Sequence, residues 1–360
     1  MSRAKEATTQ TLVVLFGRSL GIVASLASVL FLTRYLTARE LILTQVTSLV
    51  SELISTVGDL GFGLAMQRRL PALLESDVDE ANGLIGTFLL ASLATITVGS
   101  IIVYLLAERI GASFLKEPGG GNFIVLAIPA VAVQIWRNQL FVLMQGTRSF
   151  GRYSVLSLTY QLCWVSGSIA FYFAWGFKGF LVGLAFGAAL PCAYETWKMR
   201  RFLVMPPASG KCVQFFRLAL GYYPERFVNF AYTYADQWVV GFFLKDKQAL
   251  ATYFVPRRFF DQLLALLEGF WSVPTNALSR ESARGPDAIA RSLASFKRVF
   301  LYIFAPLTAG LLASSYFLVD ILAGDKYHDA VWSFGILSFF FFFSGVFAPQ
   351  AISVMVLARP

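Results

Sequence analysis

The sequence predicts an all-α membrane protein, a bundle of many transmembrane helices. Its 360 residues are 57% hydrophobic and 14% charged, with a mean hydropathy of +0.64, whereas soluble domains carry roughly 45–50% apolar and about 25% charged residues. Apolar runs of about 20 residues, long enough to span a bilayer as a helix, recur along the whole chain. Because these runs do not alternate with polar residues, they favour helices over the strands of a membrane barrel.

Ten helices are expected, joined by short connections and without an inserted soluble domain. They are placed at residues 11–33, 43–66, 82–107, 122–144, 154–175, 179–199, 214–241, 248–273, 297–320 and 330–356. A chain with so little soluble sequence is expected to act within the membrane.

Composition and motifs exclude several classes of function. The net charge of +9 is spread in small groups at the ends of apolar runs, which argues against a nucleic-acid surface. The three cysteines and the single histidine have no metal-ligand spacing. No nucleophile–base pair and no phosphate-binding loop is present, since "GFG" at 61–63 and "GGG" at 119–121 lack the pattern of such a loop. We therefore expect neither an enzyme nor an ATP-driven pump, and no cofactor or metal.

The distribution of Lys and Arg predicts the orientation. The segments on the side of the N-terminus hold 16 of the 30 basic residues, and those on the opposite side hold 8. Because cytoplasmic loops are enriched in Lys and Arg, the N-terminus is expected in the cytoplasm. Arg68 and Arg69 would then anchor the second helix at the cytoplasmic face.

A weak internal repeat divides the chain. A shift of 208 positions aligns the first two helices with the seventh and eighth through nine identities, among them Arg18/Arg226 and Gly61/Gly269. Six helices separate the copies, so both copies run in the same direction, as in transporters with parallel repeats. We therefore expect two six-helix lobes, residues 1–205 and 206–360, of which the second has only four helices before Pro360.

Charged and polar side chains occur inside the apolar helices, where each charge costs about 2.5–3.5 kcal/mol at the bilayer centre. Such residues face a bundle interior or a hydrated cavity, so the first, second, seventh and eighth helices are expected to line one cavity. The residues in question are Arg18, Glu52, Asp59, Tyr222, Arg226, Asn229, Thr233, Asp236, Arg257, Arg258 and Asp261.

Structural roles compete with this interpretation. Arg257 and Asp261 are spaced to neutralise each other along one helix, and Arg18 is placed where it can snorkel to lipid headgroups. Glu52 and Asp59 are equally compatible with hydrogen bonds that pack helices together. Asp236 lies near the end of its helix, where a capping role is the alternative.

Several stretches resemble the bacterial polysaccharide (O-antigen type) flippases of the multidrug/oligosaccharidyl-lipid/polysaccharide exporter superfamily. "VGDLGFGLAMQRRL" resembles the end of that family's second helix, and "FVNFAYTYADQWVVGFFLKDKQALATYFVPRRFFDQL" is similar to its seventh and eighth helices. "VPTNALSR" and "ILAGDKYHDAVWSFGILS" resemble later family segments in the same order. The matching positions are Asp59, Leu60, Gly61, Gly63, Ala65, Arg69, Asn229, Asp236, Gly241, Leu244 and Tyr253.

The resemblance implies a twelve-helix, two-lobe exporter that moves a polyprenyl-diphosphate-linked oligosaccharide across the bacterial inner membrane. Its expected partners are that lipid-linked oligosaccharide, membrane lipid and other polysaccharide-assembly proteins. Arginine suits a diphosphate because its planar fork makes two hydrogen bonds at once. Expected substrate contacts are Arg18, Arg226, Arg257, Arg258, Asn229, Thr233 and Tyr222, with Tyr232 and Tyr234 for sugars, and expected gating or ion-coupling residues are Glu52, Asp59, Asp236 and Asp261.

Two rival functions remain open. A cation-coupled drug antiporter of the same superfamily would use the carboxylates and a cavity poor in arginine, so the four arginines on the cavity helices argue against it. The second rival is a membrane scaffold that transports nothing, or a sugar-polymer ligase. A ligase would need a large extracytoplasmic loop, and the loops here are short.

Overall fold

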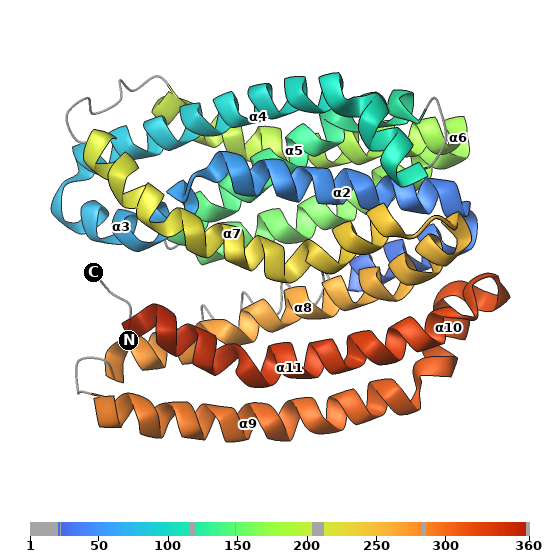
Figure 1. Cartoon of the computed structure of the whole chain (residues 1–360). Helices are drawn as coiled ribbons and strands as arrows, with labels where there is room; N and C mark the ends of the chain where they lie inside the picture. The colour runs from blue at the N-terminus through green and yellow to red at the C-terminus, as the bar shows by residue number, and fades with distance from the viewer. Residues whose placement is uncertain are drawn as a thin grey trace. The chain divides into compact units, whose positions relative to one another are not determined.

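The computed structural model describes residues 21, 23–115, 120–147, 149–203, 212–281 and 286–357, and these residues form helices and no strand (Figure 1). A first helical segment covers residues 23–35. The later helices are α2 (Ala38–Asp59), α3 (Phe62–Ser76), α4 (Val78–Leu115), α5 (Gly121–Gly146), α6 (Phe150–Leu203), α7 (Cys212–Phe243), α8 (Lys247–Glu281), α9 (Pro286–Ala313), α10 (Ser315–Ala323), the short 3-10 helix η2 (Gly324–Tyr327) and α11 (Ala330–Leu357). The predicted all-α membrane fold is confirmed.

Six helices in the described part of the chain are long and apolar enough to cross a membrane. These spans are Ala38–Asp59, Val78–Phe114, Gly121–Gly146, Gly151–Arg200, Ala290–Ala313 and Ala330–Phe347. The span in α6 has 50 residues and would be about 75 Å long if it were straight, far more than the hydrocarbon core of about 30 Å. It breaks at Trp175 and Gly176, and Gly176 has a φ of 64°. The break makes two arms, as the predicted helices 154–175 and 179–199 require.

Glycines bring the two arms of α6 together. A Cβ atom at Gly179 would lie 2.1 Å from the Phe171 carbonyl oxygen, and one at Gly187 would lie 2.1 Å from the Cys163 carbonyl oxygen. Gly183 is in the same position against the Gly167 carbonyl, at 2.5 Å. The four-residue spacing of these glycines is typical of membrane helices whose backbones touch.

The predicted single helix over 43–66 is wrong, because the chain turns sharply at Leu60 and Gly61. Both residues are left-handed, with φ values of 47° and 82°, and they separate α2 from α3. The predicted helix over 297–320 is likewise divided, since α9 ends at Ala313 and α10 begins at Ser315.

The chain forms two compact units. Of the described residues, the first unit comprises 21, 23, 24 and those within 36–250, and the second comprises 25–35 and those within 251–357. The predicted division at 205/206 into repeat lobes stays a prediction, because these units follow packing and not the repeat. Helix α7, assigned to the second lobe by its position in the sequence, packs in the first unit against α2, α3 and α4.

In the first unit, α5 packs against α4 and α6 (Figure 1). The apolar core lies between these helices and α3, with Met66, Phe88, Leu140 and Met144 almost fully buried. Phe215 and Ala219 bring α7 into the same core.

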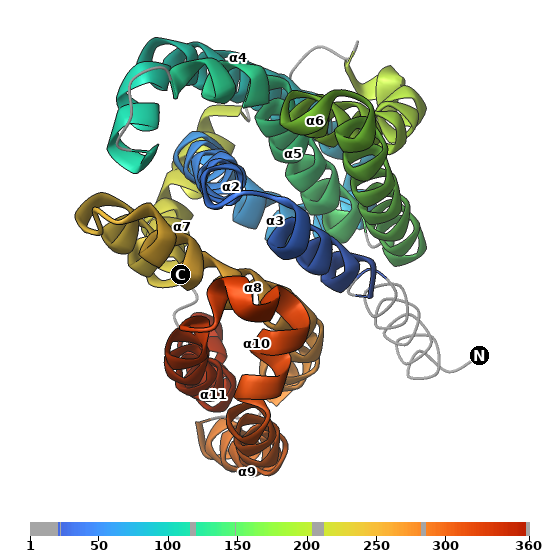
Figure 2. The ribbon, with the colours of Figure 1, turned by 90° about the vertical axis from the view of Figure 1, so that its right-hand side faces the viewer.

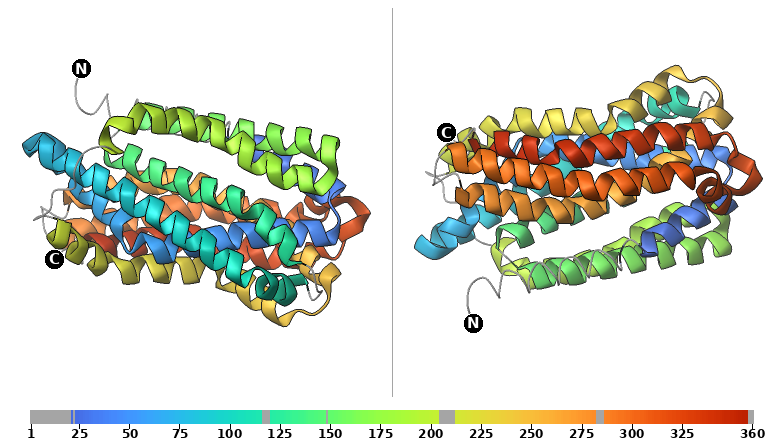
Figure 3. Two further views of the ribbon diagram at one scale, coloured as in Figure 1. Left: turned by 90° about the horizontal axis from the view of Figure 1, so that it is seen from above. Right: turned by 90° about the horizontal axis from the view of Figure 1, so that it is seen from below.

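In the second unit, α9 and α11 lie side by side (Figure 3), and α10 lies next to α11 (Figure 2). Phe260 of α8 packs on Phe334 and Phe341 of α11, with ring centres 4.9 and 6.0 Å apart. The first helical segment is attached to the end of α10, because Thr33 donates to the Leu322 carbonyl and Arg34 Nη2 donates to the Ile321 carbonyl at 2.9 Å.

Candidate functional site

Asp59 closes the turn between α2 and α3. Its Oδ1 accepts a hydrogen bond of 2.9 Å from the backbone N–H of Gly63, in the first turn of α3. Helix N-termini carry unsatisfied N–H groups and a partial positive charge, so a carboxylate there stabilises the helix. Arg226 of α7 adds an electrostatic attraction to the same carboxylate. These contacts are structural, and the predicted gating role of Asp59 stays a prediction.

Gly61 fits the turn against α7. A Cβ atom on this glycine would lie 2.0 Å from the Ala219 carbonyl oxygen and 3.0 Å from the Tyr223 nitrogen. Phe62, the next residue, packs on Phe215 with ring centres 5.6 Å apart. The turn and the first half of α7 therefore touch through backbone atoms.

Polar side chains of α7 contact α3 near the start of α7 and α2 farther along the helix. The Arg68 guanidinium lies 4.5 Å from the Tyr222 ring centre and 3.6 Å from Glu225. Gln45 Nε2 of α2 donates to Gln237 Oε1 at 2.6 Å, and both side chains are buried. Buried amides that satisfy each other are a common means of joining membrane helices.

The other α7 residues predicted as substrate contacts lie on the same helix. Asn229 is exposed, and the Thr233 hydroxyl donates to its carbonyl at 2.8 Å. Tyr232 is 59% exposed, while Tyr234 and Asp236 are half-buried.

Glu52 belongs to a polar cluster between α2 and α5 that includes two residues we did not predict as site residues. Asn138 Nδ2 donates to Glu52 Oε1 at 3.5 Å, and Asn138 Oδ1 accepts from Arg137 Nη2 at 2.7 Å. The Arg137 guanidinium also lies 4.5 Å from the centre of the buried Tyr160 ring. One amide thus joins a carboxylate to a guanidinium in the membrane-spanning part of the fold. The only signal in the sequence was the pair "RN" within the apolar run "IPAVAVQIWRNQLF".

In the second unit, two neighbouring arginines of α8 differ in their contacts. Arg257 is fully buried, its Nε lies 3.2 Å from Asp261 Oδ1, and its guanidinium lies 5.6 Å from the Phe340 ring centre. The pairing of Arg257 with Asp261 predicted from their spacing is therefore present. Arg258 is 8% exposed, and its Nε and Nη2 have no hydrogen-bond partner within the described residues.

The predicted site residues are thus distributed over the two units. Glu52, Asp59, Tyr222, Arg226, Asn229, Thr233 and Asp236 lie in the first unit, and Arg257, Arg258 and Asp261 lie in the second. Arg18 lies outside the described residues. A cavity shared by these residues remains a prediction. Among the described residues, no group of three His, Cys, Asp or Glu side chains is arranged to hold a metal ion.

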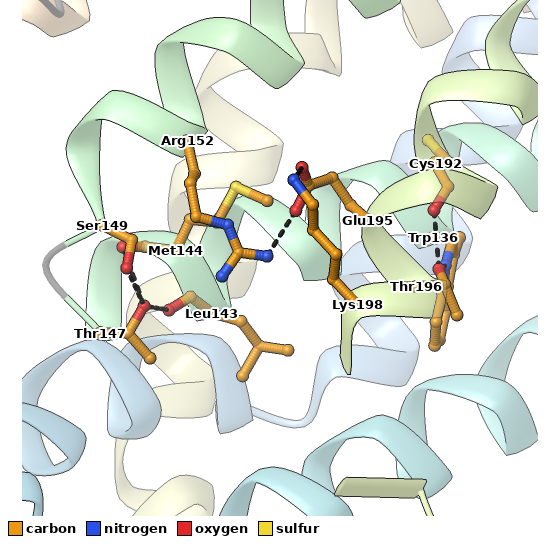
Figure 4. A network of polar contacts seen from close by, with 10 residues as sticks. All are labelled: Trp136, Leu143, Met144, Thr147, Ser149, Arg152, Cys192, Glu195, Thr196 and Lys198. Atoms are coloured by element: carbon orange, nitrogen blue, oxygen red, sulfur yellow. Dashed lines mark hydrogen bonds and ion pairs between the residues drawn. The ribbon is translucent and has the colours of Figure 1, made fainter. Parts of the chain in front are cut away.

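A further polar network joins the start of α6 to the later part of the same helix, where α6 also bonds to α5 (Figure 4). The buried Glu195 accepts from Arg152 Nη2 and lies 3.2 Å from Lys198 Nζ. Trp136 Nε1 donates to Thr196 Oγ1 at 2.7 Å. We did not predict this network, because Arg152 and Glu195 are 43 positions apart in the sequence.

Comparison with known proteins places these features in a family. The family model for polysaccharide biosynthesis proteins matches residues 31–332. The chain belongs to this family. No curated protein matches the sequence.

The fold of this polysaccharide biosynthesis protein is similar to that of several solved transporters. The lipid II flippase MurJ in an inward closed conformation has a TM-score of 0.71 at 14% identity, over 98% of this chain and 76% of MurJ. A mutant of the Vibrio cholerae MATE transporter VcmN has a TM-score of 0.67 at 13% identity, over 98% of this chain and 85% of that transporter. A MOP superfamily transporter from Pyrococcus furiosus has a TM-score of 0.62 at 12% identity, over 97% of this chain and 82% of that transporter. The predicted resemblance is confirmed at the level of the polysaccharide biosynthesis family and of the fold, and the protein is a multi-pass membrane protein with a transporter fold.

Proposed function

We propose that this protein moves a polyprenyl-diphosphate-linked oligosaccharide from the cytoplasmic to the outer leaflet of the bacterial inner membrane. The observation that carries the proposal is the match to the polysaccharide biosynthesis family over residues 31–332 of a chain with a transporter fold. A sugar precursor made on a lipid must cross the membrane before it is added to a surface polymer. A transporter in that family supplies this step without catalysing a covalent reaction.

The chemistry of the ligand agrees with the polar groups of the helices. A diphosphate carries about two negative charges, and it leaves water only where fixed cations replace its hydration. Arg258 has two donor nitrogens without a hydrogen-bond partner in the described structure, so we assign the diphosphate first to this residue. Arg18 and Arg226 remain further candidates, and exposed Asn229 with Thr233 can contact sugar hydroxyls.

The carboxylates divide by their contacts. Asp59 and Asp261 have structural partners, Gly63 and Arg257, respectively. Glu52 is bound at 3.5 Å by one amide of α5, and Asp236 is half-buried in α7. Because the bond to Glu52 is long, we assign gating or ion coupling first to Glu52, and Asp236 stays a further candidate on its position in α7.

A cation-coupled antiporter is the second candidate, favoured by the similar TM-scores of MATE transporters and by Glu52 in a membrane-spanning helix. The two functions differ in cargo. An antiporter exports soluble compounds, whereas an exporter of lipid-linked sugar leaves drug susceptibility unchanged. A scaffold without transport would change neither surface polysaccharide nor drug susceptibility.

Complementation tests the proposal. The full-length protein is expressed in bacteria that lack their own exporter, are supplied with the matching glycosyltransferases, and accumulate the lipid-linked oligosaccharide inside. We expect surface polysaccharide to return and the accumulated intermediate to fall, with unchanged susceptibility to cationic drugs. Drug resistance without surface polysaccharide would support the antiporter, and neither effect at normal protein abundance would support the scaffold.

Orientation follows from the basic residues and gives a second prediction. In a protein whose three cysteines are replaced, Asp246→Cys and Asp325→Cys should react with an impermeant maleimide added to intact cells. Ser76→Cys should react only after the cells are opened, because the end of α3 is predicted on the cytoplasmic side. Labelling of Ser76→Cys alone in intact cells would reverse the orientation.

A further inference from the structure

The second arm of α6 carries an exposed stripe that changes in character along the helix. Phe186 and Leu190 are 65% and 67% exposed, and one and two turns farther on Tyr194 and Trp197 are 57% and 59% exposed. The spacing of these four residues places them on one helix face. The basic residues Lys198 and Arg200 follow at the end of this face, and both are exposed. The order along α6 is therefore apolar, aromatic and then basic.

The opposite face of the same turns is buried and fixed in place. Cys192 and Met199 belong to the apolar core. Glu195 between them contacts both Arg152 and Lys198 with its two oxygens (Figure 4). Because two cations share one carboxylate, this network keeps one net positive charge at the surface.

The exposed cations are held against the exposed rings. Lys198 Nζ lies 4.1 Å from the centre of the Tyr194 ring, and the Arg200 guanidinium lies 4.4 Å from the centre of the Trp197 ring. Arg200 Nη1 also donates to the Trp197 carbonyl at 3.1 Å. Cation–aromatic contacts of this kind limit the movement of long side chains while other donors stay available to an anion.

We propose that this end of α6 is a binding site for one anionic glycerophospholipid. The acyl chain lies along Phe186 and Leu190, the glycerol region lies at the two aromatic rings, and the phosphate group contacts Lys198 and Arg200. Tyr and Trp favour the level of the headgroups, and Lys and Arg reach from there to the phosphate. The pairs of residues thus occur in the order in which a phospholipid presents its parts.

This order separates a lipid from a soluble anion. Phe186 and Leu190 lie in a membrane-spanning segment and face acyl chains, so the anion that meets Lys198 and Arg200 beside them is the phosphate of a lipid. The described charges also suit a ligand of low charge, because Arg200 and the Arg152–Glu195–Lys198 group carry about two positive charges. Zwitterionic phosphatidylcholine would gain little from them, whereas each basic residue near an anionic surface is worth about 1 kcal/mol, or roughly fivefold in affinity.

Quenching of Trp197 by lipid tests the site. The purified full-length protein in detergent is titrated with phosphatidylglycerol or phosphatidylcholine brominated near the headgroup. The signal of a Trp197→Phe variant is subtracted to isolate this residue. We expect half-maximal quenching at a lower mole fraction of phosphatidylglycerol than of phosphatidylcholine, and the double variant Lys198→Gln/Arg200→Gln should weaken this preference by about 25-fold.

Two controls make the result decisive. Lys245→Gln/Lys247→Gln removes the same charge near the start of α8 and should leave the lipid preference intact. Inorganic phosphate at millimolar concentration should not relieve the quenching. A preference for phosphatidylglycerol that is unchanged in the Lys198→Gln/Arg200→Gln variant would overturn the proposal. Relief of the quenching by inorganic phosphate would show a site for soluble anions instead of a lipid.

Discussion

Replacing Gly61 by alanine is expected to destabilise the first unit by roughly 2–5 kcal/mol. Gly61 has a φ of 82°, a conformation that costs an L-residue about 1–2 kcal/mol. The new Cβ would also lie 2.0 Å from the Ala219 carbonyl oxygen. That neighbour is backbone of α7, so no change of rotamer can relieve the overlap, and α3 and α7 must separate.

Gly221→Ala is a matched control for this prediction. Gly221 lies on α7 near the same contact, but a Cβ atom there would meet nothing within 4 Å. Both variants are purified in detergent and heated, and the folded fraction is followed by size-exclusion chromatography. We expect the melting midpoint of Gly61→Ala to fall by roughly 5–15 °C and that of Gly221→Ala to stay near the original. Equal midpoints would show that the turn at Gly61 is not packed as described.

Length and hydropathy were sufficient to predict where most helices lie. Each apolar run became a helix because its backbone must satisfy its own hydrogen bonds in lipid. The break at Trp175 and Gly176 could also be predicted, since one straight helix of that length cannot fit a single crossing. The pairing of Arg257 with Asp261 followed from their spacing on one helix.

The turn at Leu60 and Gly61 could not be predicted in this way. "DLGFG" stands inside one continuous, largely apolar run, and helices in membranes tolerate glycine. The turn packs closely against Ala219, a residue 158 positions away from Gly61, and a contact of that range is not visible in local hydropathy. The role of Asp59 was undecided for the same reason, because its partner Gly63 becomes a helix N-terminus only after that turn has formed.

The cluster of Glu52, Arg137 and Asn138 shows the limit of predictions based on single helices. Helical spacing identified the polar faces of the first, second, seventh and eighth helices, and the repeat drew attention to the same four. The fourth predicted helix, residues 122–144, lay outside this pattern, although its Asn138 joins Glu52 to Arg137 in the folded unit. The partner of a charged residue inside an apolar run must therefore be sought on every helix of the bundle.

Replacing Arg258 and replacing its neighbour Arg257 are expected to have different effects on transport. We expect Arg258→Ala to reduce export of the lipid-linked oligosaccharide strongly while the protein keeps its abundance. Two nitrogens of Arg258 have no hydrogen-bond partner in the described structure, so removing the side chain relieves a desolvation cost. Loss of hydrogen bonds to a charged ligand costs about 1.5–3 kcal/mol, or roughly 10- to 100-fold in affinity.

Arg257→Ala serves as the matched control, because Arg257 has the same chemistry and a different environment. Its Nε is paired with Asp261 at 3.2 Å, and the side chain is fully buried. Its removal leaves a cavity and takes from Asp261 the guanidinium that lies 3.2 Å away, at a cost of about 3 kcal/mol. We therefore expect Arg257→Ala to lower membrane abundance and thermal stability, and export should fall only in proportion to the protein lost.

The measurement is surface polysaccharide per unit of membrane protein in the complementation strain, for Arg257→Ala, Arg258→Ala, Arg258→Lys and the double variant Arg18→Ala/Arg258→Ala. Lysine keeps the charge but lacks the planar fork, so Arg258→Lys should recover part of the export. The double variant should export least, because Arg18 belongs to the same predicted set. Normal polysaccharide from the double variant at unchanged abundance would exclude a cationic cavity, and the carboxylates Glu52 and Asp236 would then become the better candidates for driving transport.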